Sequence, residues 1–480
     1  MAHLKIVIKS VRFYKKPVLY QILIIALLSA VITGSILTGW SVKASLKKTA
    51  SEHLGNTGIL ISSGNRFFDL SLTARLKESA LINSAGLLEM NGFCQNLNTQ
   101  KGVLNAHIYA VTEDFFRFQG NDTINLNTGE AAVNEKLAAS LDLKKGDELI
   151  IRFNTISDIP ADAPFAPSKD EGRSIVMKIG KILTPAISGN FSLSINQVVP
   201  ENIFINLSDV INNSDNQFKI NRLLIENNNK ITTTEAYNIF RKFLRPSDLG
   251  LKVIPLKKTG GYELRSDRIF LENSLISEIK NYIPSSAPLI TYLGNKLSHG
   301  SISATYSFVS ALPGSLYPEI VTGNDIIINR WLADDLAIIK GDTLEMAWYA
   351  PDSLSKLIER TNRFCVKRIV EIDGIWSDSL LMPDFPGISG RESCSEWDAG
   401  VTIKLNDIRK KDEDYWNKFR GTPKAFINYD KGIELWGNNF GPATAIRFPE
   451  NISEKEISER LAGYLDPVKN GFIITDLYRE

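Results

Sequence analysis

The chain has 480 residues, of which 55 are Lys or Arg and 54 are Asp or Glu, so its net charge is +1 at pH 7. This length exceeds one small core and predicts two or three domains. The balanced charge gives no electrostatic reason to expect a nucleic acid as partner, and a hydrophobic content of 43% excludes wholesale disorder.

Residues 1–16 form a short basic segment. Leu4, Val7, Ile8 and Val11 fall on one helical face, with lysines largely opposite. We interpret this segment as a cytoplasmic amphipathic helix on the inner membrane surface, with an irregular basic tail as the alternative.

Residues 17–40 follow as an apolar stretch, and no charge occurs between Lys16 and Lys43. As a helix this stretch measures roughly 36 Å, which is enough to cross a bilayer. The apolar part of a cleaved signal peptide covers only about 7–15 residues, so we expect a retained span. Tyr20 and Trp40 lie near its ends, where aromatic side chains favour the membrane interface.

The flanking charges predict the orientation of this span. Five Lys or Arg residues precede it, and only Lys43, Lys47 and Lys48 follow it closely. This asymmetry favours a cytoplasmic N-terminus, which places the rest of the chain on the extracytoplasmic side of the inner membrane. No second stretch of spanning length follows residue 40. We therefore expect a single-pass protein embedded in the lipid bilayer.

One unit occurs twice, as "AAVNEKLAASLDLKKGDELIIRF" at 131–153 and "DIIINRWLADDLAIIKGDTLEMAW" at 325–348. A short β-rich run ends at an asparagine, which is a good helix N-cap. Leucines then recur at helical spacing, Gly-Asp makes a turn, and a second β-rich run follows. The pattern predicts strand–helix–turn–strand in each copy, with Asn134 and Asn329 as the caps.

Four further pairs of segments follow the same order in both halves. They are "NRFFDLSLTARLK" with "DRIFLENSLISEIK", "SIVMKIGKIL" with "FCVKRIVEID", "IFINLSDVI" with "VTIKLNDIR", and "LRPSDLGLKVIPL" with "LDPVKNGFIITDL". Two copies are too few for a solenoid. We predict an α+β protein in which one transmembrane helix precedes a duplicated mixed α/β domain, with module boundaries at 41–258 and 259–480.

A search for chemistry finds no catalytic signature. The sequence lacks the GxxxxGK[ST], HExxH and GxSxG motifs, and its four histidines are dispersed. We expect no catalytic, cofactor-binding or metal-binding residues, no cofactor and no enzymatic activity. The three cysteines permit at most one disulfide; Cys365 and Cys394 are candidates, and unpaired thiols are the alternative.

Two stretches belong to the second copy alone, a turn-rich loop at 381–400 and a charged helix with aromatic residues at 410–426. One interpretation makes them a binding element with Tyr415, Trp416 and Phe419 as contacts. The other treats them as an insertion whose aromatic side chains pack on the module. We favour the second interpretation, because buried aromatic residues are common.

The basic helix, the span, "SGNRFF", "YAVTEDFFRF", the first repeated unit and "VMKIGKIL" occur in an order that resembles ABC transporter permeases of the MacB/FtsX type. "LMPDFPGISG" and "ELWGNNFG" extend the resemblance over nearly the whole chain. It implies a MacB-like periplasmic core domain, a separate cytoplasmic ABC ATPase as partner, a second permease copy, and mechanical work or regulation across the membrane.

The sequence departs from that family at its end. The family has further spans after the extracytoplasmic domain, whereas this sequence ends at "GFIITDLYRE". We therefore expect the anchor and extracytoplasmic part of a truncated or split permease. The alternative is a stand-alone, membrane-anchored binding or sensor protein. The sequence indicates neither the substrate nor the oligomeric state.

Overall fold

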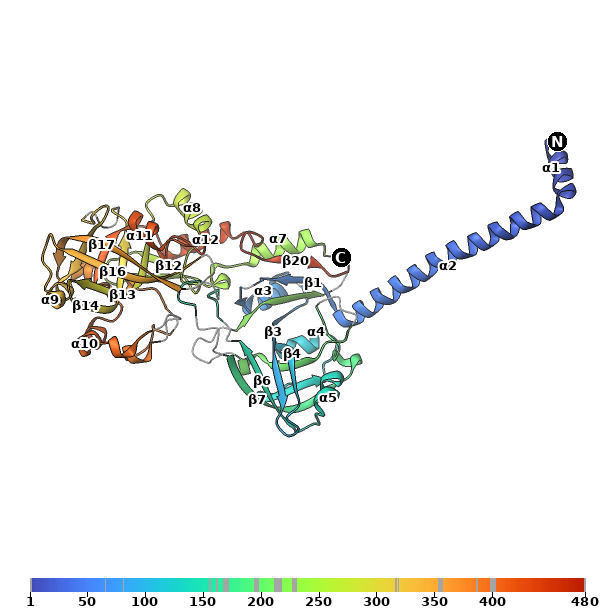
Figure 1. Cartoon of the computed structure of the whole chain (residues 1–480), viewed down its shortest axis with the longest axis horizontal. Helices are drawn as coiled ribbons and strands as arrows, with labels where there is room; N and C mark the ends of the chain where they lie inside the picture. The colour runs from blue at the N-terminus through green and yellow to red at the C-terminus, as the bar shows by residue number, and fades with distance from the viewer. Residues whose placement is uncertain are drawn as a thin grey trace.

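The computed structural model shows a long helix that projects from a body of two β-rich modules (Figure 1). It describes the chain apart from residues 1, 65, 81, 155–156, 161–162, 167–171, 194–197, 211–217, 227–230, 316, 318, 353–356, 386, 398–402 and 479–480. The expected fold class is confirmed: an N-terminal apolar helix precedes a duplicated mixed α/β structure.

Two helices form the N-terminal part, α1 (Ala2–Phe13) and α2 (Lys15–Leu54). The predicted span at 17–40 lies within α2, but the helix continues for about four further turns beyond it. Those turns form a stalk between the apolar stretch and the first module (Figure 1). Within α1, the side chains of Leu4, Val7 and Ile8 lie outside the described ones, so the amphipathic face stays a prediction.

The first sheet has nine strands in the order β20-β1-β10-β3-β4-β8-β5-β7-β6. An additional β3–β6 pairing closes six of these strands into a barrel, which leaves β10, β1 and β20 as a three-stranded extension. The bounds are β1 (Thr57–Ser62), β3 (Ser84–Asn96), β4 (Gly102–Val111), β5 (Glu130–Asn134), β6 (Glu148–Asn154), β7 (Gly172–Leu183), β8 (Asn202–Asn206), β10 (Arg222–Glu226) and β20 (Ile473–Asp476). A separate small sheet pairs β2 (Phe68–Asp69) with β9 (Lys219–Ile220).

The second sheet repeats this topology in the order β11-β12-β19-β13-β14-β18-β15-β17-β16, and a β13–β16 pairing closes its barrel. Its strands are β11 (Leu251–Pro255), β12 (Tyr262–Ser266), β13 (Ala287–His299), β14 (Ile302–Leu312), β15 (Asp325–Asn329), β16 (Thr343–Pro351), β17 (Leu357–Val370), β18 (Ala425–Asn428) and β19 (Ala445–Phe448). Because the strand orders correspond one to one, the duplication holds for topology as well as for sequence.

Helices pack on the barrels and on the three-stranded extensions. The α-helices of the modules are α3 (Ser71–Ala80), α4 (Glu113–Phe118), α5 (Glu135–Leu141), α6 (Leu207–Val210), α7 (Thr233–Phe243), α8 (Asn273–Tyr282), α9 (Arg330–Leu336), α10 (Lys410–Phe419), α11 (Tyr429–Trp436) and α12 (Glu454–Tyr464). Short 3₁₀ turns are η1 (Pro185–Ile187), η2 (Pro246–Leu249), η3 (Gly374–Ser377), η4 (Ser379–Leu381), η5 (Cys394–Glu396) and η6 (Leu405–Asp407).

The repeated unit has the predicted strand–helix–turn–strand structure in both copies. The Asn134 side chain accepts a hydrogen bond from the Leu137 amide at 3.0 Å, and Asn329 accepts one from the Leu332 amide at 2.9 Å. Both leucines are fully buried. The glycine of each Gly-Asp turn has a left-handed φ, near 96° in the first copy and 98° in the second, so the predicted use of glycine is confirmed.

One predicted pairing of segments is wrong. "IFINLSDVI" at 203–211 does not correspond to "VTIKLNDIR" at 401–409, of which residues 401–402 lie outside the described part and η6 is a 3₁₀ turn. The counterpart of β8 is β18, because both run parallel to the preceding long strand and antiparallel to the strand of the repeated unit. Both contain Phe-Ile-Asn.

The two modules exchange their last strands. β11 follows the first copy in sequence but pairs with β12 in the second sheet, whereas β20 ends the second copy and pairs with β1 in the first sheet. The sheets therefore cross the predicted division between residues 258 and 259. One hydrophobic core also spans both copies; it joins, for example, Ile61 and Phe240 with Leu264 and Phe472.

Candidate functional site at the foot of the membrane helix

Helix α2 is the one helix in the described part of the chain that is long and apolar enough to cross a membrane. Its last turn is fixed to the first module. His53 is 6% exposed, and its carbonyl accepts a hydrogen bond from the Ser192 amide at 3.1 Å. Directly after the helix, the Asn56 side chain donates to the Phe118 carbonyl at 2.8 Å. Any tilt of α2 therefore acts on the first barrel through packed groups.

The exchanged strand β20 lies at the same place. β1 begins three residues after α2 ends, and β20 pairs with it antiparallel. The Leu477 amide also donates to the Gly58 carbonyl at 3.0 Å. The C-terminal end of the described chain consequently lies close to the foot of α2, as Figure 1 shows. Both copies of the duplication are attached at this point.

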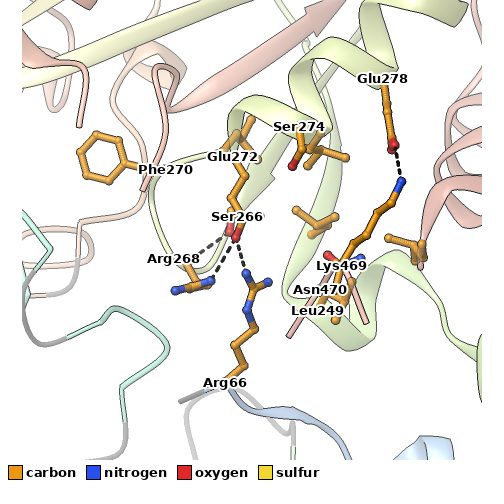
Figure 2. Close-up of a pocket in the computed structure, with 14 residues that line it drawn as sticks. Arg66, Leu249, Ser266, Arg268, Phe270, Glu272, Ser274, Glu278, Lys469 and Asn470 are labelled. Carbon is orange, nitrogen blue, oxygen red and sulfur yellow. Dashed lines mark hydrogen bonds and ion pairs between the residues drawn. The ribbon is translucent and has the colours of Figure 1, made fainter. Parts of the chain in front are cut away.

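Ion pairs connect the two copies beneath this attachment. Glu272 accepts from Arg66 of the first copy, and its Oε1 lies 3.5 Å from Nη1 of Arg268 (Figure 2). Lys219 contacts Asp158, and its ammonium lies 3.3 Å from the Asp267 carboxylate. Burial raises the pKa of Asp158, and the nearby ammonium of Lys219 opposes that rise. These groups hold the copies together by charge as well as by the exchanged strands.

One ion pair occurs at the equivalent place in each copy, and the charges of its two partners are reversed between the copies. Arg75 on α3 lies 2.5 Å from Asp248 in η2, and Glu278 on α8 lies 3.7 Å from Lys469 in the matching turn. Burial raises the pKa of Asp248, although hydrogen bonds from Arg75 and the Arg245 amide oppose the rise. Both copies therefore keep an ion pair between this helix and this turn. The helix carries the cation in the first copy and the anion in the second.

A small pocket of about 60 Å³ lies among these contacts. It is lined by apolar residues that precede the exchanged strands, including Leu249 before β11 and Leu465 before β20. Charged residues that line it include Arg66, Glu272 and Lys469 (Figure 2). The carboxylates that line it pair with these cations. The pocket therefore belongs to the joint between the copies.

A loop of the first copy also inserts into the second module. Phe165 is 4% exposed, and its ring centroid lies 4.8 Å from that of Tyr292 and 4.6 Å from that of Phe385. Ile159 and Ala163 join the same hydrophobic cluster. The long loop after β6 thus packs against the neighbouring module, a contact that the sequence did not predict.

The residues singled out in the sequence are distributed as follows. Tyr415 and Trp416 are buried, whereas Phe419 is half-buried, which agrees with packing of the insertion on its module. Cys94, Cys365 and Cys394 are free thiols. Among the described residues, no group of three or more His, Cys, Asp or Glu side chains is arranged to hold a metal ion.

No family model matches the chain, and no curated protein sequence matches it significantly. Several solved structures are similar to part of it, among them the following two. The periplasmic region of MacB from Actinobacillus actinomycetemcomitans has 13% identity and a TM-score of 0.27, over 41% of this chain and 86% of that one. A domain of a putative permease protein from Porphyromonas gingivalis has 11% identity and a TM-score of 0.25, over 40% of this chain and 81% of that one.

Proposed function

We propose that this chain is the membrane anchor and extracytoplasmic domain of a permease subunit in an ABC-type transporter or mechanotransmission complex. The observation that carries the proposal is the unbroken course of α2 from the apolar stretch into the first module, where packed contacts fix its foot. A continuous helix transmits tilt or displacement without a hinge. The exchanged strand β20, beside that foot, extends the coupling to the second copy.

The experiment is isolation of the full chain from native membranes with its partners. Co-purification of a P-loop ATPase supports the proposal. A matched control replaces residues 1–43 by an unrelated span of the same length, and the ATPase should then be lost while the folded modules remain. Repeated absence of an ATPase, together with capture of an extracytoplasmic partner, would instead support the stand-alone binding or sensor protein.

We propose that the span lies in the inner membrane. Residues 1–16 then lie in the cytoplasm, and the residues after Lys43 lie on the extracytoplasmic side. The five positive charges before the span, against three close behind it, support this orientation. Single cysteines introduced on either side of the span test it with an impermeant thiol reagent in intact cells. Labelling at residue 2 would contradict the orientation.

We further propose that the chain is no enzyme and that it acts beside a second permease copy or separate permease spans. The ranges 41–258 and 259–480 are proposed as units of duplication rather than of independent folding, because each sheet contains a strand from the other range. Activity screening of the full chain tests whether it is an enzyme, and robust turnover would contradict our proposal.

Cross-linking in membranes tests whether the chain acts beside a second permease copy or separate permease spans, and an exclusively monomeric chain would contradict that part of the proposal.

A further inference from the structure

The two barrels differ in the chemistry of one outer face. Four neighbouring strands form this face in each copy, β4-β3-β6-β7 in the first barrel and β14-β13-β16-β17 in the second. At four equivalent positions the first copy has an apolar side chain, whereas the second copy has a polar or charged one. The pairs are Leu104 and Thr305, Phe93 and Lys296, Ile150 and Glu345, and Val176 and Arg363. We call the four residues of the first copy the apolar strip.

The strand register establishes these equivalences. Ile150 faces Val176 across β6 and β7, and Glu345 faces Arg363 across β16 and β17. Leu149, the neighbour of Ile150, is fully buried inside the first barrel. Because successive side chains of a strand point to opposite faces, Ile150 and its partner point outward.

The apolar strip is accessible to solvent. Leu104 is 86% exposed and Val176 is 55% exposed, while the other two members are half-buried. At the equivalent place in the second copy, Glu345 and Arg363 form an ion pair at 2.9 Å. The fold therefore does not require apolar residues on this face. A strip of them across four strands, about 14 Å wide, indicates an interaction site rather than a structural need.

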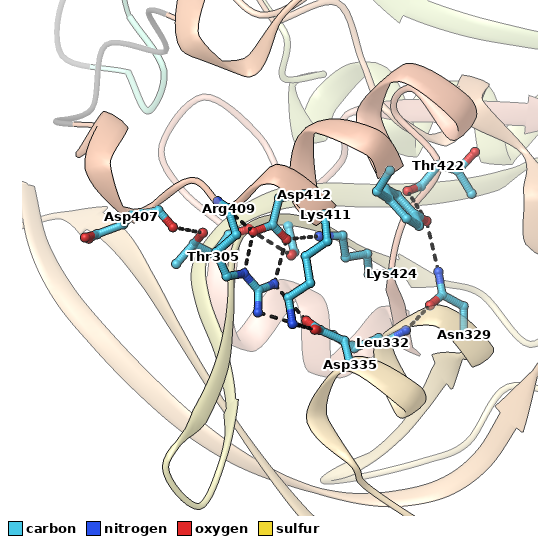
Figure 3. A network of polar contacts seen from close by, with 12 residues as sticks. Thr305, Asn329, Leu332, Asp335, Asp407, Arg409, Lys411, Asp412, Thr422 and Lys424 are labelled. Carbon is cyan, nitrogen blue, oxygen red and sulfur yellow. Dashed lines mark hydrogen bonds and ion pairs between the residues drawn. The ribbon is translucent and has the colours of Figure 1, made fainter.

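The second copy shows what covers one end of this face. Its insertion, residues 371–424 between β17 and β18, includes the short turn η6. There Thr305 donates to the Asp407 carbonyl at 2.9 Å (Figure 3). The equivalent residue of the first copy is Leu104, which stays open to solvent. A segment of protein thus covers this corner in one copy, and the same corner is bare in the other.

The charge beside the strip constrains what can cover it. Arg152 lies on the same face as Ile150, and its guanidinium lies 5.8 Å from the Phe93 ring centroid. On the other side of Ile150, Lys178 faces Glu148 in the strand register. Arg152 forms no ion pair with any residue that the structure describes. A covering segment with a carboxylate would therefore complement this face.

Two other occupants fit this face less well. The strands β6 and β7 lie on the side of the first module away from α2, and the stalk separates that module from the apolar stretch (Figure 1). The strip is therefore remote from the bilayer that the proposed span would cross. A second copy of the chain would present the same excess of positive charge, and like charges disfavour association.

From these observations we propose that the apolar strip is the docking face for a segment of another extracytoplasmic protein, in which apolar residues are flanked by Asp or Glu. The segment would cover the strip as η6 covers the equivalent corner of the second barrel, with one carboxylate against Arg152. The proposal rests on the proposed topology, which thiol labelling tests separately. It does not depend on an ATPase partner, so the two proposals can fail independently.

Photo-cross-linking of the full chain in intact cells of its native host tests the proposal. The photoreactive residue p-benzoylphenylalanine replaces Leu104 or Val176, and it replaces Arg363 in the matched control. We expect the same protein to be captured from positions 104 and 176, with a yield about tenfold lower or less from position 363. Mass spectrometry of the captured peptide should find apolar residues next to Asp or Glu.

An exchange of side chains between the copies locates the face. Ile150→Glu with Val176→Arg gives the first barrel the ion pair of the second. The yield from position 104 should then fall about tenfold or more, because two apolar side chains are no longer buried by the partner. The reverse exchange, Glu345→Ile with Arg363→Val, alters the second barrel and should leave that yield unchanged.

Arg152→Glu tests the charge of the partner. It should lower the yield from position 104 severalfold, because a carboxylate of the partner would then meet a like charge. Thermal unfolding must show that every variant is folded. If the double exchange on the first barrel is unstable, Val176→Arg alone replaces it, since that side chain is already exposed.

Several outcomes overturn the proposal. They are the absence of a protein adduct at positions 104 and 176, different proteins at the two positions, and a yield that the exchange on the first barrel does not change. Adducts formed only with lipid, with a second copy or with another segment of this chain would identify a different occupant and also overturn it. An undiminished yield in Arg152→Glu, or a captured peptide without Asp or Glu, would overturn the acidic character of the partner.

Discussion

The two copies share one topology but place opposite chemistry at one equivalent pair of positions. Leu60 on β1 faces Leu224 on β10, and the matching neighbours on β12 and β19 are Glu263 and Arg447. In both copies the second residue of the pair also faces the beginning of the long barrel strand, β3 or β13. The register is therefore the same, and only the side chains differ.

Each pair is buried, and each has the neighbours that its chemistry requires. Leu60 and Leu224 pack among the phenylalanines of α4. Glu263 is 0% exposed and accepts from Arg447, 3% exposed, at 2.7 Å, while Arg447 also donates to Tyr317 and Asp378. The comparison shows that this topology tolerates either solution when every buried group is satisfied.

The largest expected effect comes from breaking the charged pair. Arg447→Leu leaves Glu263 buried with less compensation, so it should cost about 3–5 kcal/mol in the free energy of unfolding. Glu263→Leu together with Arg447→Leu restores the chemistry of the first copy and should cost less than Arg447→Leu alone. Urea unfolding of the full chain, followed by tryptophan fluorescence, measures both.

A double variant less stable than Arg447→Leu would contradict this expectation. It would mean that Arg265 and Asp378, which contact the same pair, depend on it for their own compensation. Leu224→Ala in the first copy is a control of ordinary size, since a buried leucine costs about 2–5 kcal/mol when truncated.

The buried leucines of the repeated unit test whether the copies unfold together. Leu137→Ala and Leu332→Ala should each cost about 2–5 kcal/mol, because both side chains are fully buried. Six of the seven tryptophans lie after residue 330 and report mainly on the second module. Because the modules exchange strands, Leu137→Ala should also lower the unfolding midpoint seen by fluorescence. An unchanged midpoint would show that the modules unfold independently.

The helix caps provide a smaller and more symmetric test. Asn134→Ala and Asn329→Ala should each cost about 1 kcal/mol, since each removes the acceptor for an otherwise unpaired helix amide. Serine at either position should recover part of the loss, because its hydroxyl can cap the helix. If serine were no better than alanine at Asn329, the decisive contact would be its amide donation to Tyr415 at 2.9 Å.

The smallest expected effect is on the pH dependence of stability, and it belongs to the second copy alone. Burial acts to raise the pKa of Asp412, but hydrogen bonds from Arg409 and the charge of Lys424 lower it below its ordinary value. The stabilisation by the charged form is therefore complete above about pH 4 and is lost as the pH falls further.

Asp412→Asn lacks this titration. The difference in melting temperature between wild type and Asp412→Asn should be constant from pH 7 to pH 5 and should shrink between pH 4 and pH 3. A difference that grows as the pH falls would show that Asp412 is protonated more readily in the folded state.

Sequence reasoning succeeded where the deciding interactions are local. Asn134 and Asn329 each cap a helix through an amide only three residues further along the chain, and the Gly-Asp turns need only one left-handed residue each. The apolar helix was also predictable, although its extension to Leu54 was not. Gly39 lies near the end of the apolar stretch, but the helix continues through it, so the local signal there does not locate the end of the helix at Leu54.

Prediction failed where the deciding contacts are distant. The insertion before β18 places the true counterpart of β8 further along the sequence than the first copy would suggest. A local similarity at 401–409 was therefore matched to β8 instead. The Phe-Ile-Asn that β8 and β18 share is the sequence signal that could have identified the correct pair. The exchange of β11 and β20 left no periodicity to detect, because a strand has the same pattern in either sheet. The contact of Phe165 with Tyr292 and Phe385 likewise depends on packing between segments far apart in sequence.

The exchanged strand also determines when the protein can finish folding. Leu60 pairs with Thr475, more than 400 residues later in the sequence, so the first sheet stays incomplete until β20 has been synthesised. Contacts of such sequence separation form slowly, because a long loop must close before they form. Until then the edge of β1 is unpaired, and such edges promote association between chains. Nascent copies of this protein should therefore be prone to associate with one another until β20 emerges.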